Sequence, residues 1–558
     1  MPTRRTRWPL LPLLLLCSAL YLPGLRQLPP VDRDEARYAQ AAREMLAAGD
    51  WVLPRLQNEP RLRKPIGAYW LQAIVVRGTG AESAIAAHRL PSVAGALIAV
   101  LVTFLIGRRW FASHTAWLGA ALLASASLMV VEAHLATTDA LLLAAVVVMQ
   151  GCLAALYAAA RRGRLGRWQS AAGFWLALAA GVLIKGPVAP LLAVTTLAAL
   201  ALADRTAPRR SLVIALRPNW GVALAAACIA PWAVAAGHAA GWQALPSAML
   251  ADLTPKLLGA HESHGAPPGA YLLTLPATFW PGSLALLFFA CPTWRRRRRT
   301  PERFLLAWLV PAWLLFECLP TKLPHYVLPT FPALALLVAR AALSQPRQLR
   351  PSPQHPVART LASGWALLTL AIGAIALIAA VWLGNQTALV ASALCVAICA
   401  AVGAIALRRF WRAQLSAALC TAVLGAVSIY ALLLSAVLPN LDALWPSRAA
   451  ATAIEQAGAG RAVAAVGYHE ISILLLTRRG LSMVDAAGAV ALLAAQPDAL
   501  VLITDAERPA FMAAARQRGL ELRTRWSTHA LNYSRGDWID LDLIERDTPL
   551  GHAPRAGD

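Results

Sequence analysis

The segment 31–70 gathers acidic, basic and aromatic residues whose spacing could support chemistry on an anionic substrate. Within it, residues 33–48 are predicted to be helical, and Asp34, Arg37 and Tyr38 then share one face at positions i, i+3 and i+4. A carboxylate can orient or deprotonate an attacking group, and a guanidinium can bind a phosphate through two parallel hydrogen bonds. The sequence therefore predicts an acid, a cation and a phenol that point the same way.

The residues at both ends of this helix indicate how it is held. Asp32 is placed to cap the helix with Glu35 as its third residue, a variant of the capping box, and Gly49 fits the position just past the last turn. Trp51 and Trp70 are of the type that lies at membrane interfaces. We expect the helix to lie flat on a membrane with its polar face toward a cavity. The alternative is an ordinary extramembrane loop.

Lysine gives a second indication of an anion site. The 51 basic residues include four lysines, at Lys64, Lys185, Lys256 and Lys322, in a chain that otherwise uses arginine. All four are predicted on the outer side of the membrane, opposite to where topology alone would place cations. A compact ammonium suits phosphate as a point charge, although each lysine could instead be a snorkelling residue.

Two further residues extend the candidate site. Asp139 opens an apolar segment and is a candidate second acid, a position that also suits a helix N-cap. Tyr326 lies in the run TKLPHY at 321–326, whose proline breaks a span near the outer surface. Tyr326 and Lys322 could therefore line a cavity instead of facing lipid.

A divalent metal ion is the cofactor that the residue types suggest. His261 and His264 could share such an ion with Glu82, which lies at another outer helix end. The alternative is that both histidines are simply hydrated. The eight cysteines lie in or at the ends of apolar runs without a C-x-x-C spacing, which argues against a disulfide framework or a zinc knuckle.

Composition defines the broad class of the protein. With 558 residues, 58% hydrophobic and 14% charged, the chain is too apolar for a soluble globule and is predicted to be an integral membrane protein. The formal charge of +23 would suit nucleic acid, but the arginines cluster in short tracts between apolar runs, as topology signals do. We expect membrane lipid around the chain, no nucleic-acid partner, and a monomer.

Thirteen apolar segments are predicted to cross the membrane, near residues 8–25, 85–107, 112–132, 140–160, 170–184, 187–203, 219–240, 271–291, 304–319, 326–343, 361–383, 387–407 and 414–438. Arginine tracts occupy alternate connections, beginning at the N-terminus, and mark the cytoplasmic side. Of the fourteen acids before residue 439, only Asp204 and Glu302 fall in these inner connections. Because acids at a membrane are costly and are functional candidates, the chemistry is expected on the outer face.

Composition divides the chain into two domains. Residues 1–438 form the predicted transmembrane domain, whose first outer loop covers 26–84, and residues 439–558 form a small α/β domain on the outer side. In the second domain, strand-like runs alternate with alanine-rich helical stretches, and 499–526 is predicted as strand, helix, strand.

Seven blocks of the membrane domain, in the same order, resemble one bacterial family. They are Asp34-Glu35-x-Arg37-Tyr38, REMLAAGDWVLP (43–54), RKPIGAYW (63–70), TTDALLL (137–143), IKGPVAP (184–190), HGAP (264–267) and TKLPHYVLP (321–329). They resemble the motifs of the lipid A aminoarabinose transferases, which are type C polyprenyl-phosphate-dependent glycosyltransferases related to protein O-mannosyltransferases. The likeness covers residues 30–335.

The resemblance implies an enzyme with the type C glycosyltransferase fold. Such an enzyme moves 4-amino-4-deoxy-L-arabinose from undecaprenyl phosphate to phosphate groups of lipid A, on the periplasmic face of the bacterial inner membrane, and so gives polymyxin resistance. By the same resemblance Asp34 and Asp139 are the two acids, and Arg37 and Lys64 contact the carrier phosphate. Lys322 and Tyr326 are implied as further cavity residues.

Two other functions remain open at this point. The acceptor could be a serine or threonine hydroxyl of a protein, for which a carboxylate base would be indispensable. A flippase for lipid-linked sugars is the second alternative. It is disfavoured because the sequence shows no inverted repeat, and the outer acids sit at loop ends instead of at mid-membrane.

Overall fold

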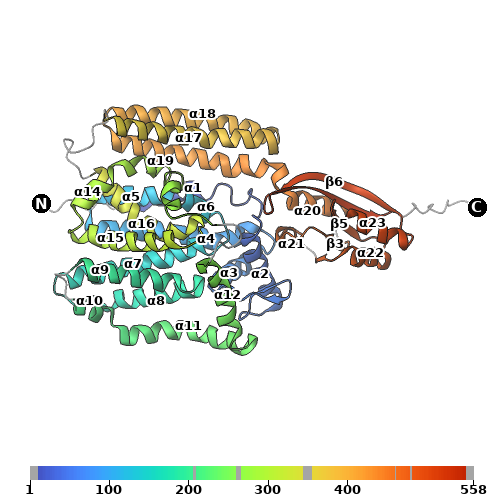
Figure 1. The fold of residues 1–558 in the computed structure, drawn as a ribbon, viewed down its shortest axis with the longest axis horizontal. Coiled ribbons are helices and arrows are strands. Elements are labelled where there is room, and N and C mark those ends of the chain that lie inside the picture. The colour runs from blue at the N-terminus through green and yellow to red at the C-terminus, as the bar shows by residue number, and fades with distance from the viewer. Residues whose placement is uncertain are drawn as a thin grey trace, which may run out of the picture.

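The computed structural model describes residues 10–204, 209–258, 265–343, 355–458, 460–477 and 480–547. These residues form a bundle of helices and, at one end of it, a small domain built on a β-sheet (Figure 1). The predicted fold class, a polytopic α-helical membrane protein with a small C-terminal α/β domain, is confirmed.

The bundle is formed by the described residues between 10 and 440. Its α-helices are α1 (Leu10–Tyr21), α2 (Asp34–Ala48), α3 (Gly67–Thr79), α4 (Ile85–Trp110), α5 (Ser113–Ser125), α6 (Ser127–Ala133), α7 (Asp139–Ala160), α8 (Trp168–Lys185), α9 (Val188–Ala203), α10 (Arg209–Leu216), α11 (Pro218–Ala240), α12 (Ala244–Leu258), α13 (Ala270–Thr278), α14 (Ala290–Arg295), α15 (Thr300–Cys318), α16 (Phe331–Leu343), α17 (Pro356–Leu383), α18 (Gln386–Trp411) and α19 (Leu415–Leu432). A short hairpin, β1 (Arg55–Leu56) and β2 (Glu59–Pro60), follows α2.

The thirteen predicted segments all fall on helices, but several are short or broken. Within the described ranges, seven helices are long and apolar enough to cross a membrane, or eight if α5 and α6, bent by 62° at their junction, form one span. The predicted span 271–291 is divided among α13, a 3-10 helix (Gly282–Phe288) and α14. Broken helices are tolerated inside a bundle because neighbouring groups satisfy the freed backbone.

The two ends of the bundle differ in charge. Helices α10 and α14, next to predicted inner arginine tracts, lie at the end opposite to α2, α3 and the sheet domain (Figure 1). The inner acid Asp204 accepts hydrogen bonds from Tyr157 at 2.6 Å and Arg161 at 2.9 Å. Glu302 lies 3.6 Å from the Arg340 Nε atom. The two predicted inner acids are therefore paired within the protein.

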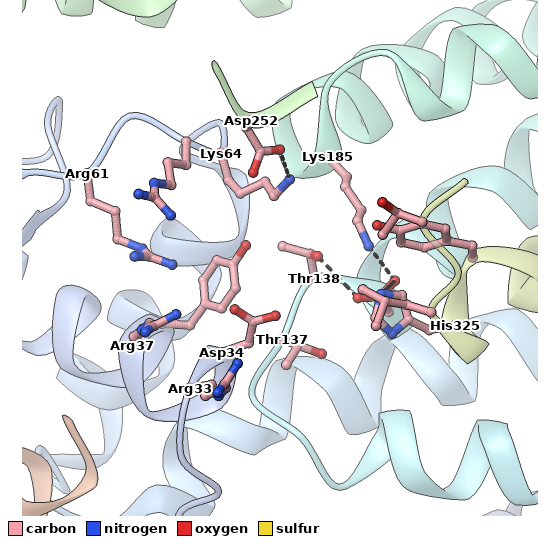
Figure 2. A pocket seen from close by; sticks show the side chains of 16 residues that line it. Arg33, Asp34, Arg37, Arg61, Lys64, Thr137, Thr138, Lys185, Asp252 and His325 are labelled. Carbon is pink, nitrogen blue, oxygen red and sulfur yellow. Dashed lines mark hydrogen bonds and ion pairs between the residues drawn. The ribbon is translucent and has the colours of Figure 1, made fainter. Parts of the chain in front are cut away.

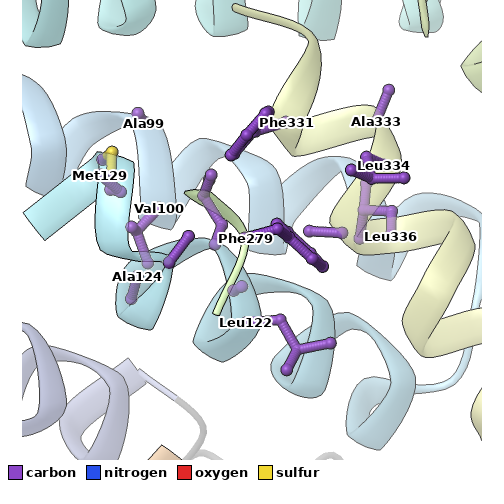
Figure 3. Close-up of a cluster of buried hydrophobic side chains, with 14 of the residues drawn as sticks. Ala99, Val100, Leu122, Ala124, Met129, Phe279, Phe331, Ala333, Leu334 and Leu336 are labelled. Atoms are coloured by element: carbon purple, nitrogen blue, oxygen red, sulfur yellow. The ribbon is translucent and has the colours of Figure 1, made fainter. Parts of the chain in front are cut away.

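A hydrophobic cluster where α4, α5, α6 and α16 meet holds the middle of the bundle (Figure 3). The rings of Phe279 and Phe331 pack edge to face with centroids 5.5 Å apart. At Gly119 a Cβ atom would lie 2.8 Å from the Leu336 side chain, so glycine is what lets α5 approach α16 so closely.

Helix α2 begins and ends almost where the sequence predicts. Gly49 follows its last residue with φ 67° and donates its backbone N–H to the Leu46 carbonyl, as expected of a C-terminal glycine. The predicted cap at the other end is wrong, because the N-cap residue is Arg33, which makes no side-chain capping bond. The Asp32 carboxylate instead accepts the backbone N–H of Ser472, far along the chain.

Glu35 forms a buried ion pair with Arg89. Both of its oxygens accept bonds of 2.8 Å from the Arg89 guanidinium, and both side chains are excluded from solvent. Arg89 also donates to the carbonyls of Leu25, Leu28 and Pro29. The two Glu35 oxygens further accept the backbone N–H groups of residues 31 and 136. The pair therefore ties α4, the start of α2 and the loop before α7 together.

The C-terminal domain is built on a five-stranded mixed sheet of order β4-β3-β5-β7-β6. Its elements are α20 (Pro446–Ala457), β3 (Val463–Val466), α21 (Ile471–Leu476), β4 (Leu481–Met483), α22 (Ala486–Ala495), β5 (Leu500–Thr504), α23 (Arg508–Gln517), β6 (Leu522–Asn532) and β7 (Asp537–Arg546). The predicted strand, helix, strand order of 499–526 corresponds to β5, α23 and the start of β6. Hydrophobic clusters cover both faces of the sheet, which makes the domain a unit with its own core.

We predict that Arg89→Met strongly destabilises the bundle. The substitution leaves the Glu35 carboxylate buried without its cation, which costs about 3–5 kcal/mol. The melting temperature of the protein in detergent should fall by several degrees. Arg77→Met, at the exposed end of α3, is the matched control and should leave it unchanged. Equal melting temperatures for both variants would contradict a stabilising role of the pair.

Candidate active site

A cavity of about 200 Å³ opens where α2, the loop after it, the start of α7 and the end of α8 meet. Its lining is polar and charged, and comes from segments far apart in the chain: Arg33, Asp34, Arg37, Tyr38, Arg61, Arg63, Lys64, Thr137, Thr138, Asp139, Lys185, Asp252, Thr321, Leu323, His325 and Tyr326. Figure 2 shows the side chains of Arg37, Arg61 and Asp34 facing those of Lys185 and His325 across the opening.

The cavity brings together seven of the residues that the sequence singled out. They are Asp34, Arg37, Tyr38, Lys64, Asp139, Lys185 and Tyr326. The predicted helical face holds, because the first three of them all come from α2 and line the same wall.

Lys322 lies outside this lining. Its ammonium donates to the backbone carbonyls of Glu317 at 2.9 Å and Leu319 at 2.5 Å, and lies 5.9 Å from the Tyr271 ring centroid. A cation at these carbonyls satisfies groups that the end of α15 leaves without a partner. The structure thus uses Lys322 to end a helix, while Thr321 and His325 of the same run line the cavity.

The predicted metal ligands are not brought together in the part of the chain that the structure describes. His261 and His264 lie outside the described residues. The backbone carbonyl of Glu82 lies 3.2 Å from the His88 ring, and Glu82 does not line the cavity. Across the described ranges there is no group of three or more His, Cys, Asp or Glu side chains that could hold a metal ion.

Asp139 is paired with a cation at the far wall. The Lys185 Nζ atom lies 2.6 Å from its Oδ1 atom, and the His325 Nε2 atom lies 3.9 Å from the same oxygen. The other nitrogen of His325 lies 3.6 Å from a Glu132 oxygen, and Glu132 also accepts a bond of 3.2 Å from Thr137. Asp139 therefore sits in a chain of ionisable groups that fixes its orientation.

The first loop supplies the second ion pair and an aromatic wall. The Lys64 Nζ atom donates to Asp252 of α12 over 2.6 Å. Arg61 donates to the Tyr69 hydroxyl over 3.2 Å, and its guanidinium lies 5.7 Å from the Tyr38 ring centroid. Burial, reinforced by the neighbouring Tyr69, raises the pKa of the Tyr38 phenol well above its ordinary value. Tyr38 is therefore a neutral phenol at physiological pH.

Nine of the sixteen lining residues were not selected from the sequence, and three of them, His325, Asp252 and Arg61, show why. His325 lies inside the run TKLPHY, from which Lys322 and Tyr326 were selected but not the histidine. Asp252 was placed on the outer side as an acid, but nothing in its local pattern links it to Lys64. Arg61 gave no signal, because arginine is common in this chain.

The charge balance of the cavity favours an anion. Six basic side chains line it, against the three carboxylates of Asp34, Asp139 and Asp252. Such an excess of cations around a small polar hollow stabilises negative charge on a group that enters it. Asp34, on the wall opposite Lys185, is placed to orient a second group in the same space.

Comparison with known proteins relates the chain to polyprenyl-linked glycosyltransferases. The family model described as dolichyl-phosphate-mannose-protein mannosyltransferase matches residues 13–238. A Pseudomonas paraeruginosa protein named undecaprenyl phosphate-alpha-4-amino-4-deoxy-L-arabinose arabinosyl transferase is 31% identical over 349 residues, 62% of this chain and 61% of that protein. A protein of the same name from Pectobacterium carotovorum is 32% identical over 59% of this chain and 58% of its own length. The chain thus spans about three fifths of the curated relatives it matches.

Solved structures extend the likeness to nearly the whole fold. The crystal structure of ArnT from Cupriavidus metallidurans bound to undecaprenyl phosphate superposes with a TM-score of 0.72 at 18% identity, covering 96% of this chain and 98% of that one. The apo state of the same protein gives a TM-score of 0.71. The type C glycosyltransferase fold and the resemblance to the lipid A aminoarabinose transferases are therefore both confirmed, the fold over nearly the whole chain and the sequence likeness over about three fifths of it.

Proposed function

We propose that the protein is a glycosyltransferase that moves 4-amino-4-deoxy-L-arabinose from undecaprenyl phosphate to a phosphate group of lipid A. The observation that carries the proposal is the cavity, which collects three acids and six basic side chains from distant segments into one hollow. The names of the relatives and the carrier lipid bound to the Cupriavidus protein support the same donor. The added sugar amine would reduce the negative charge of lipid A and so give resistance to polymyxin.

The proposed reaction is a single displacement at the sugar C1 atom. A phosphate oxygen of lipid A attacks C1, the bond from C1 to the carrier phosphate oxygen breaks, and undecaprenyl phosphate leaves with the electron pair. The new bond inverts the configuration at C1. Lys64 and Arg37, on the side of the cavity formed by the first loop and α2, stabilise the departing phosphate.

The acids have an orienting role in this reaction. Because the acceptor phosphate is already ionised, Asp34 does not need to be a strong base, and positioning of the reacting groups can supply much of the rate. Asp34 holds the donor sugar against the incoming oxygen, and Asp139 with Lys185 forms the opposite wall. No proton has to be removed from the acceptor.

The orientation of the chain agrees with a periplasmic reaction. Helix α2, which lines the cavity, and the C-terminal domain lie at one end of the bundle (Figure 1). Helices α10 and α14, which adjoin the arginine tracts, lie at the opposite end. Arginine-rich connections face the cytoplasm in bacterial inner-membrane proteins. The proposal therefore places the reaction at the outer surface of the inner membrane.

A second candidate acceptor is the hydroxyl group of a protein serine or threonine. The match of residues 13–238 to the protein mannosyltransferase family favours this alternative. A neutral hydroxyl must lose a proton, so Asp34 or Asp139 would then act as a general base. Mass spectrometry of lipid A and of secreted proteins from the same cells separates the two acceptors.

We predict that Asp34→Asn lowers transfer by at least about 100-fold, because the amide keeps the shape of the side chain but loses the charge that orients the sugar. The assay incubates purified protein with the polyprenyl-phosphate sugar and lipid A, with and without a chelator, and weighs the products. Glu44→Gln, on α2 but outside the cavity lining, is the matched control and should retain activity. Normal aminoarabinose content after Asp34→Asn would remove this residue from the mechanism.

We predict that Lys64→Ala weakens binding of undecaprenyl phosphate by about 10- to 100-fold, which corresponds to roughly 1.4–2.8 kcal/mol for one charged hydrogen bond. The dissociation constant can be measured from the thermal shift that the lipid produces in detergent. Arg77→Ala, an exposed cation on α3, should bind like the unmodified protein. Unchanged affinity in the Lys64 variant would assign the carrier phosphate to other cations of the cavity.

A further inference from the structure

The C-terminal domain contacts the two residues that precede the candidate catalytic acid. The backbone N–H of Asp32 donates to the Tyr533 hydroxyl over 2.6 Å, and the backbone N–H of Ser472 donates to the Asp32 Oδ1 atom over 3.1 Å. The Arg33 guanidinium donates to the Ser534 carbonyl. Two separate parts of the domain, helix α21 and the turn between β6 and β7, therefore converge on one short turn.

The domain side of this contact is fixed by its own buried hydrogen bonds. One oxygen of Glu470 accepts the Asn532 amide at 3.1 Å and the Ser534 hydroxyl. Glu470 and Asn532 are 9% and 6% exposed, and Asp32 is 7% exposed. Buried polar groups that satisfy one another in this way specify a single arrangement, because leaving any of them without a partner is costly.

A second contact holds α2 itself. The Arg43 guanidinium donates to the carbonyls of Leu474 and Leu475 at 3.1 and 3.2 Å, near the end of α21. The domain therefore hydrogen-bonds to the helix that carries Asp34 at two places: just before its start, at Asp32, and more than two turns further along, at Arg43.

The backbone directly before α2 has an unusual conformation. Arg33 has φ 70° and ψ −107°, a region that non-glycine residues rarely adopt and that persists only where the surroundings impose it. On one side Glu35 is fixed by Arg89, and on the other Asp32 is held by the C-terminal domain. Asp34 is the next residue after this bend, so the conformation of Arg33 decides where its carboxylate enters the cavity.

We propose that the C-terminal domain is a positioning element of the active site, in which Tyr533 and Ser472 hold Asp32 and thereby direct Asp34 into the cavity. The inference rests on the proposed glycosyl transfer and gives the domain a part in it. Asp32 and Tyr533 line no part of the cavity, so they are positioning residues and not catalytic ones.

The test compares kcat and KM for the carrier lipid in full-length variants. Asp32→Ala removes the oxygen that accepts the Ser472 N–H, whereas Asp32→Asn keeps it. We expect Asp32→Ala and Tyr533→Phe to lower kcat about 10- to 100-fold, since a misplacement of about 1 Å can cost that much, with KM changed by less than about twofold. Asp32→Asn should restore kcat to within a few-fold of the unmodified protein.

Asp485→Ala is the matched control inside the same domain. The exposed Asp485 carboxylate accepts the backbone N–H of Gly488 at 2.8 Å at the start of α22 and belongs to neither α21 nor the turn between β6 and β7, so its loss should leave kcat unchanged. Full kcat in a folded Asp32→Ala protein would overturn the proposal, as would equal losses in the Ala and Asn variants. If the unmodified protein transfers no sugar, the proposed function itself fails, which is a different result.

A pH series tests the contact even if a variant folds poorly. The titratable and charged groups around Asp32 are Glu470, Tyr468 and Tyr533 of the domain and Arg33 and Glu35 of its own segment. Burial, together with the nearby Glu470 carboxylate and against the hydrogen bond from Ser472, raises the pKa of Asp32 from its ordinary 3.8 to about 7.

The sign of the pH effect follows from this raised pKa. Asp32 binds a proton more tightly when the C-terminal domain is docked against it than when the domain is undocked. The stability of the contact is therefore greatest below pH 3.8, the ordinary pKa, and falls as the pH rises toward about 7. Above that pH it changes no further. Asp32→Asn cannot ionise. The difference between the melting temperature of the Asp32→Asn variant and that of the unmodified protein should therefore increase, in favour of the variant, from pH 5 to pH 7.5. A difference that stays constant with pH would overturn the placement of Asp32 in this buried contact.

Discussion

The buried pair of Glu35 and Arg89 is the constraint on which the arrangement of the cavity depends. Two opposite charges without water are stable only when geometry is good and every remaining donor and acceptor has a partner. Here the guanidinium gives five hydrogen bonds, two to the carboxylate and three to backbone carbonyls. The carboxylate also accepts the backbone N–H of Ala136. The pair therefore fixes the distance between the wall that carries Asp34 and the loop that leads into α7, which begins at Asp139.

Two of the six cations in the cavity are paired with carboxylates. Lys64 lies against Asp252, and Lys185 against Asp139, each at 2.6 Å. These ion pairs hold the ammonium groups of Lys64 and Lys185 at fixed positions in the lining of the cavity. A phosphate that enters can share these cations without a large rearrangement, because an ammonium has three donors and each carboxylate takes only part of them. The aromatic wall of Tyr38 and Tyr69 adds a rigid surface beside the charges.

The sequence predicted those features that depend on local patterns, and it failed where distant segments meet. The end of α2 at Gly49, the shared face of Asp34 and Arg37, and the strand order within 499–526 follow from spacing and residue type. Glu35 was misjudged because its partner lies 54 positions away, and a local capping pattern was the nearer explanation. Lys322 has the residue type of a phosphate ligand. Because it follows the end of α15 closely in the chain, its ammonium instead donates to the Leu319 carbonyl there. The break in the predicted span 271–291 could not be predicted from hydropathy, because the side chains stay apolar where the helix is interrupted inside the bundle.

The separation of contacts along the chain also sets the order in which the protein can be completed during its synthesis. The partners Glu35 and Arg89 emerge from the ribosome early, so their pair can form once the first helices have entered the membrane. Tyr533 follows Asp32 by 501 positions and is therefore synthesised long after it. A nascent chain that has not yet reached Tyr533 would thus already contain the cations of the cavity while lacking the last support for the turn at Asp32, and the contacts around that turn are complete only once the C-terminal domain has been made.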